Sequence, residues 1–116
     1  MLIVAMSFFA LAAILGMILL SYVLQSKNTP KGLAFTHGPL AAIGIVLLII
    51  YAFYHTPRPI ESIVLFIIAA LGGLVLIYKD LTGSPVPKVL AVGHGLIAIA
   101  GFVFLLVFSL NAMGYM

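Results

Sequence analysis

Lys31-Gly-Leu-Ala-Phe-Thr-His37-Gly-Pro-Leu-Ala-Ala-Ile-Gly44 decides the fold, because the chain contains this stretch twice. The second copy reads Lys88-Val-Leu-Ala-Val-Gly-His94-Gly-Leu-Ile-Ala-Ile-Ala-Gly101. Between residues 30 and 48, ten of nineteen positions match those 57 residues later. The repetition predicts two tandem halves, residues 1–57 and 58–116, each with one histidine at the same place.

The composition predicts a membrane protein. Of the 116 residues, 66% are hydrophobic and only 6% are charged, which is outside the range of soluble domains. A helix of about 20 apolar residues crosses the hydrocarbon core of a bilayer. We expect an all-α, single integral membrane domain over 1–116, folded as an antiparallel bundle of four transmembrane helices. The spans are expected at about 2–25, 33–54, 60–79 and 89–112, with the first retained rather than cleaved as a signal peptide.

The basic residues predict the orientation in the membrane. All four lysines lie in or beside the first and third connections, whereas the middle connection carries only Arg58. Basic residues favour the cytoplasmic side. We therefore expect a bacterial inner-membrane protein with connections 1 and 3 in the cytoplasm and both termini on the outer side.

A tandem copy of two helices keeps its orientation, so the halves are expected to be related by a pseudo-twofold axis along the membrane normal. The second and fourth helices then run parallel. His37 and His94 lie at one depth, each six residues after a lysine, which is roughly 9 Å of helix rise. Both are flanked by small residues at helical spacing. The residues at this spacing are Ala34, Ala41 and Gly44 in one copy and Ala91, Ala98 and Gly101 in the other, and Gly38 and Gly95 directly after the histidines widen the gap.

Two imidazoles on facing helices, each rising from a face with little side-chain bulk, can hold a flat metallo-macrocycle between them. The pair resembles the ligand arrangement of bis-histidyl membrane b-type cytochromes, a resemblance confined to this one site. It implies haem b with His37 and His94 as axial ligands, a six-coordinate iron and electron transfer rather than oxygen chemistry. Lys31 and Lys88 would neutralise the haem propionates. The haem would not be covalently attached, because the sequence has no cysteine and so no Cys-x-x-Cys-His motif.

Other interpretations of the histidine pair stay open. Histidines in membrane helices are often interhelical hydrogen-bond partners or proton-relay residues, and a chlorophyll-type tetrapyrrole or copper also accepts imidazole. Zinc is disfavoured, because it prefers four ligands and no Cys, Asp or Glu lies at this depth. If the histidines bind no cofactor, the protein is instead a structural subunit of a larger membrane complex, or a small four-helix transporter. A transporter would be expected to carry an acidic residue inside the membrane, whereas Glu61 and Asp80 fall at helix ends.

A second cluster lies at the outer end of the second helix. It comprises Tyr51, Tyr54, His55 and Arg58, with Glu61 close by. These side chains fit either a quinol-oxidation pocket or an ordinary aromatic belt with a polar turn.

The expected partners are the lipid bilayer and another membrane redox protein or the quinone pool, with a homodimer also compatible with the sequence. The net charge of +3 is too small to indicate nucleic-acid binding. We expect an electron carrier or an accessory subunit rather than an enzyme.

Overall fold

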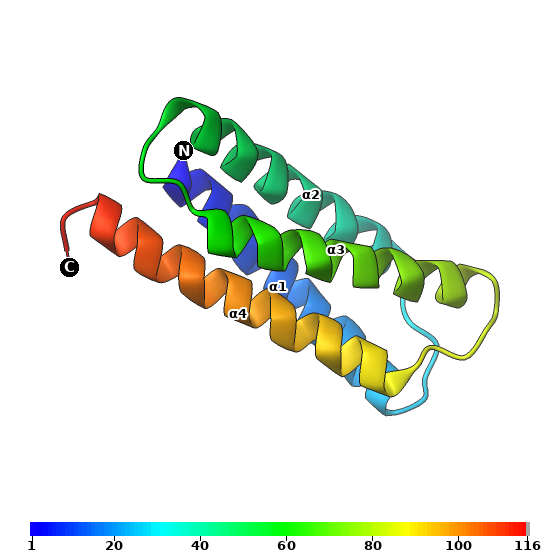
Figure 1. Cartoon of the computed structure of the whole chain (residues 1–116). Coiled ribbons are helices and arrows are strands. Elements are labelled where there is room, and N and C mark those ends of the chain that lie inside the picture. Colours follow the sequence, from blue (N-terminus) through cyan, green and yellow to red (C-terminus); the bar gives the residue numbers. More distant parts are fainter. Residues whose placement is uncertain (116) are drawn as a thin grey trace.

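Four helices make up the structure, a computed structural model that describes residues 1–115 (Figure 1). The described part contains no strand. Every helix boundary lies within two residues of the span predicted from the sequence. The helices are α1 (Leu2–Leu24), α2 (Lys31–Tyr54), α3 (Ile60–Leu81) and α4 (Lys88–Ala112).

Prolines mark where three of the helices begin. Pro30, Pro59 and Pro87 are the N-cap residues of α2, α3 and α4. Proline is tolerated there because the first turn of a helix does not use its backbone N–H groups. Pro39 lies inside α2, which nevertheless continues to Tyr54.

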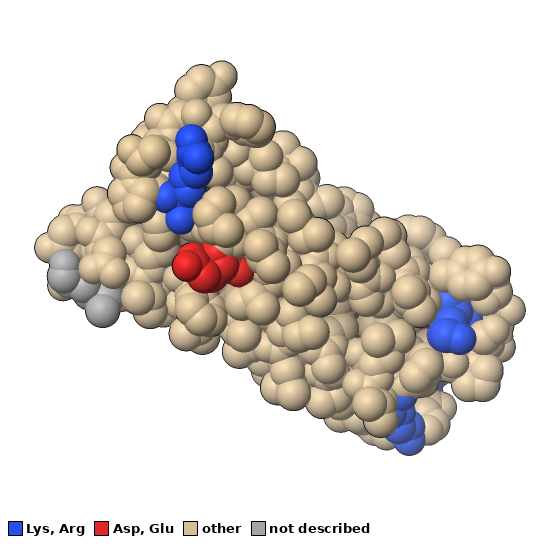
Figure 2. All heavy atoms as spheres, in the orientation of Figure 1, with Lys and Arg blue, Asp and Glu red and all other residues tan. Residues whose placement is uncertain are grey.

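Each helix is long and apolar enough to cross a membrane. The molecule measures 45 × 22 × 19 Å, so its long axis matches a bilayer of about 40–45 Å including the headgroups. Figure 2 shows charged side chains toward the two ends of the visible face, separated by a broad uncharged belt. We call the end formed by the connections 25–30 and 82–87 the lysine end, and the opposite end, which holds both termini, the terminal end.

Each helix packs against two of the other three. The pairs in contact are α1 with α2, α3 with α4, α1 with α4, and α2 with α3. Within residues 1–115, α2 makes no such contact with α4, so the two histidine-bearing helices lie diagonally across the four-helix bundle. The ribbon turns back at each connection (Figure 1).

The core lies toward the terminal end, and four of its six buried hydrophobic residues form two pairs at equivalent positions of the two copies. Phe9 and Phe66 stack with ring centroids 3.8 Å apart and planes at 3°. Leu48 and Leu105 are both fully buried. Residues 9 and 66, like 48 and 105, are 57 positions apart, as are the two histidines. The stacked phenylalanine pair therefore joins matched positions of the two copies.

Gly44 and Gly101 receive the two phenylalanine rings. A Cβ placed on Gly44 would lie 2.8 Å from Cζ of Phe9, and one on Gly101 would lie 3.2 Å from Cδ1 of Phe66. Glycine lets each ring approach the neighbouring helix closely enough to stack at the centre.

Gly44→Ala is expected to lower the free energy of unfolding by about 1–3 kcal/mol, because added atoms in a packed interior force neighbouring side chains to move. Gly32→Ala on the same helix is the matched control, since a Cβ there meets no atom within 4 Å. Alanine favours the helix over glycine by about 1 kcal/mol in both variants, so the difference between them reports the contact with Phe9. Unfolding in mixed detergent micelles, followed by circular dichroism, measures both variants. Equal stabilities would contradict the close packing of Phe9 on Gly44.

Candidate functional site

His37 on α2 and His94 on α4 lie on diagonal helices, and both rings are half-buried. Nδ1 of His37 is 2.7 Å from the carbonyl oxygen of Ala12 on α1. Nδ1 of His94 is 2.6 Å from the carbonyl oxygen of Ala69 on α3. A carbonyl oxygen only accepts hydrogen bonds, so Nδ1 is the protonated donor in both rings. Each histidine thus ties its own helix to the preceding one.

Glycine one turn after each acceptor makes room for the ring. A Cβ on Gly16 would lie 2.9 Å from Cε1 of His37, and one on Gly73 would lie 3.1 Å from Cε1 of His94. Side chains on a helix lean toward the preceding turn. A larger residue at position 16 or 73 would therefore cover the carbonyl that the imidazole binds.

The two imidazole rings lie close to each other across the bundle, in an edge-to-face arrangement. Their centroids are 6.2 Å apart and their planes are nearly perpendicular, at 82°. Both Nδ1 atoms are engaged with carbonyls, and neither Nε2 makes a hydrogen bond within residues 1–115. With Nδ1 protonated, each Nε2 keeps a lone pair that can accept a hydrogen bond or bind a metal.

The small residues predicted to surround the histidines fall into three groups. Gly38 and Gly95 border open space, because a Cβ added to either would meet no atom within 4 Å. Gly44 and Gly101 are occupied by the phenylalanine contacts described above. The four alanines lie beside the histidines on α2 and α4. Ala91 is buried, whereas Ala34, Ala41 and Ala98 are half-buried.

The two lysines at the helix starts have different surroundings. Nζ of Lys31 is 2.8 Å from Oδ1 of Asp80 and 3.0 Å from Oγ1 of Thr29. The Thr29 hydroxyl donates a hydrogen bond to the other oxygen of Asp80. Lys88 is exposed and forms no salt bridge within the described chain. Lys31 is therefore engaged in an ion pair with Asp80, whereas Lys88 is available to pair with another negative group.

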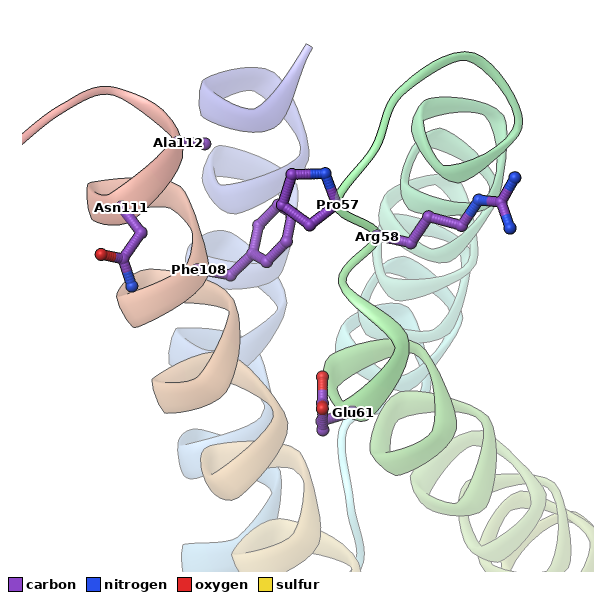
Figure 3. Close-up of a pocket in the computed structure, with 6 residues that line it drawn as sticks. All are labelled: Pro57, Arg58, Glu61, Phe108, Asn111 and Ala112. Atoms are coloured by element: carbon purple, nitrogen blue, oxygen red, sulfur yellow. The ribbon is translucent and has the colours of Figure 1, made fainter.

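The outer cluster predicted from the sequence is divided in the structure. His55 stacks on Tyr51 with centroids 4.1 Å apart, and Tyr54 is exposed nearby. Glu61 and Arg58 instead line a pocket toward α4 (Figure 3). Residues 1–115 contain no group of three or more His, Cys, Asp or Glu side chains that could hold a metal ion.

Sequence reasoning missed the carbonyl acceptors, although a signal for them exists. Ala12-xxx-Gly16 and Ala69-xxx-Gly73 are small-xxx-small patterns, which usually indicate close helix packing. In both halves the alanine precedes the histidine by 25 residues. The shared spacing indicates that the same contact between neighbouring helices forms in each hairpin.

Both histidines are expected to carry their proton on Nδ1, because the carbonyls of Ala12 and Ala69 can only accept. Heteronuclear NMR of histidine-labelled protein in micelles distinguishes the two tautomers. Gly16→Ala should displace the His37 ring and change its signals, whereas Gly32→Ala, which adds a Cβ with no atom within 4 Å, should not. Protonation of Nε2 with a bare Nδ1 in the cofactor-free protein would contradict the assigned hydrogen bonds.

Comparison with known proteins finds no matching family model, no similar curated protein and no similar solved structure.

Proposed function

We propose that this protein is a small membrane b-type cytochrome that holds one haem b between His37 and His94 and takes part in electron transfer. The observation that carries the proposal is the pair of rings with centroids 6.2 Å apart, each bound through Nδ1 to a backbone carbonyl. Metal-binding histidines usually donate their second ring N–H to a carbonyl or carboxylate, which fixes the ring and its tautomer.

The ring separation favours a bridging atom over a direct contact. A direct hydrogen bond between two ring nitrogens would bring the centroids to roughly 5 Å, given an N···N distance of about 2.9 Å. A metal bound by one nitrogen of each ring needs roughly 6 Å between centroids, since metal–imidazole bonds are about 2 Å long. The observed 6.2 Å matches the second value.

The tautomers of the two rings also favour a bridging atom between them. Two neutral rings protonated on Nδ1 both present Nε2 as an acceptor, so they cannot hydrogen-bond to each other. Two unpaired Nε2 acceptors at membrane depth need a donor or a cation as a partner. Haem iron is such a cation. Its macrocycle also supplies four further nitrogen ligands, so two side chains complete the coordination.

The lysine-end half of the bundle has the sparse packing that a large cofactor requires. From residue 17 to 36 and from 74 to 93, only Thr29 and Ala91 are buried, and neither is large. The buried Leu and Phe side chains all lie on the other side of the histidines. In this proposal the macrocycle completes the core there, bordered by Gly38, Gly95 and the four alanines.

We further propose an antiparallel bundle whose two hairpins are related by a pseudo-twofold axis along the membrane normal. Two kinds of contact support it. Phe9 stacks on Phe66 at the matched position, and the hydrogen bond between Ala12 and His37 in one hairpin corresponds to the bond between Ala69 and His94 in the other. Lys88 is the residue best placed to neutralise a propionate, because Lys31 already pairs with Asp80.

A cofactor-free structural subunit is the second candidate. It is favoured by the same Nδ1 bonds, since each satisfies a histidine within its own hairpin and so fastens two helices together. A transporter has less support, because Asp80 lies in the last turn of α3 and Glu61 in the first.

Protein purified in mild detergent is expected to show a Soret band and a pyridine haemochrome spectrum of haem b. His37→Ala and His94→Ala should each abolish or strongly reduce haem retention, because each removes one axial ligand. His55→Ala is the matched control and should retain the spectrum, since His55 is exposed and stacked on Tyr51 at the terminal end. Folded protein without haem, after expression with haem supplementation, would favour the structural subunit.

The proposed orientation places connections 1 and 3 in the cytoplasm of a bacterium and the 55–59 connection outside. The natural chain has no cysteine, so single cysteines report cleanly. A membrane-impermeant maleimide should label Thr56→Cys in intact spheroplasts and Ser84→Cys only after permeabilisation, both positions being exposed. The reverse pattern would invert the topology and leave the haem proposal intact.

A further inference from the structure

A pocket opens at the terminal end, between the start of α3 and the end of α4 (Figure 3). Its volume is about 630 Å³, which is within the usual range for small-molecule sites of about 300–1,000 Å³. It lies at the opposite end of the bundle from His37 on α2 and His94 on α4, which are near the lysine end. The lining residues are Pro57, Arg58, Glu61, Phe108, Asn111 and Ala112.

One side of the pocket is apolar. Figure 3 shows Pro57 beside the ring of Phe108. Tyr51 packs against Phe108 edge to face, with centroids 6.1 Å apart. This contact holds the Phe108 ring in place, and aromatic faces bind other rings favourably.

The polar groups of the pocket are a hydrogen-bond acceptor and an amide. Arg58 does not neutralise Glu61: its Nε donates to the Ala52 carbonyl at 2.8 Å, and its side chain points away in Figure 3. The Glu61 side chain is exposed at the mouth of the pocket, and its carboxylate makes no salt bridge or hydrogen bond within residues 1–115. Glu61 lies in the first turn of α3, the end of a helix where a negative charge is favourable. An ionised carboxylate only accepts hydrogen bonds, so it selects a ligand that donates one.

We infer that this pocket binds the headgroup of a lipid-soluble hydroquinone. The flat ring would pack between Phe108 and Pro57, one hydroxyl would donate to Glu61, and the Asn111 amide would meet an oxygen of the ring. The apolar tail of such a ligand can extend along the lipid-facing surface of α3 and α4. The redox role of the ligand rests on the proposed haem, whereas its binding does not.

The pocket's polar groups are specific to one half of the chain. Subtracting the 57-residue offset, the positions equivalent to Glu61 and Asn111 are Val4 and Tyr54. The histidines, their carbonyl acceptors and the stacked phenylalanines occur in both halves. The carboxylate and amide therefore occur in one half only, at the corner that has this pocket.

The test measures binding of decylubiquinol, kept reduced under argon, to the full chain in lipid nanodiscs. Bound ligand is the excess over empty nanodiscs of the same lipid, followed to saturation. The wild-type protein is expected to bind the hydroquinone saturably and more tightly than decylubiquinone, because the quinone has no hydroxyl to donate to Glu61. Glu61→Gln should weaken hydroquinone binding by about tenfold and change quinone binding little. Phe108→Ala should weaken both forms.

Asp80→Asn is the matched control, since it makes the same chemical change at the opposite end and should leave binding unchanged. Reduced menadione, tested alongside, tells whether the pocket prefers a single or a fused ring. Non-saturable partitioning, or equal binding by wild type and Glu61→Gln, overturns the inference. His37→Ala separates the two proposals: if it lacks haem yet binds the hydroquinone normally, the pocket is independent of the haem site. Saturable binding by a protein that never carries haem would support the pocket and refute the cytochrome.

Discussion

A polar side chain inside hydrocarbon must find a partner within the protein, and in this chain the partner is a backbone carbonyl exposed by glycine. The imidazole of His37 reaches Ala12 because Gly16 places no side chain over that carbonyl, and His94 reaches Ala69 past Gly73 in the same way. This single contact joins the helices of each hairpin and fixes the tautomer of each ring. It also leaves Nε2 of each ring without a hydrogen-bond partner within residues 1–115. In the proposed cytochrome, haem binding depends on this prior arrangement.

The two ends of the bundle differ in how their interiors are filled. At the terminal end, the stacked phenylalanines and the buried leucines form an ordinary close-packed core. At the lysine end, no large side chain is fully buried, although the helices are equally apolar. The boundary between the two regions lies at the histidines, which is why a flat cofactor at that level would complete the core rather than interrupt it.

The halves share a framework but not every function. Matched positions supply the histidines, their acceptors and the central aromatic pair, whereas the ion pair of Lys31 with Asp80 and the pocket carboxylate Glu61 each occur only once. Residue 23, the counterpart of Asp80, is valine, so Lys88 has no equivalent partner there. Charge at both ends therefore distinguishes two halves whose interiors are alike.

The sequence by itself determined the number of helices and their limits, because apolar length, proline and glycine act locally along the chain. It also singled out His37 and His94, since a repeated imidazole in hydrocarbon stands out against any aliphatic background. Only the tertiary structure decided which small residues serve which partner: Gly16 and Gly73 receive the imidazoles, whereas Gly44 and Gly101 receive phenylalanine. Every such glycine looks the same in a sequence. What each one accommodates depends on the rotation and level of the facing helix, which arise from packing across the whole bundle.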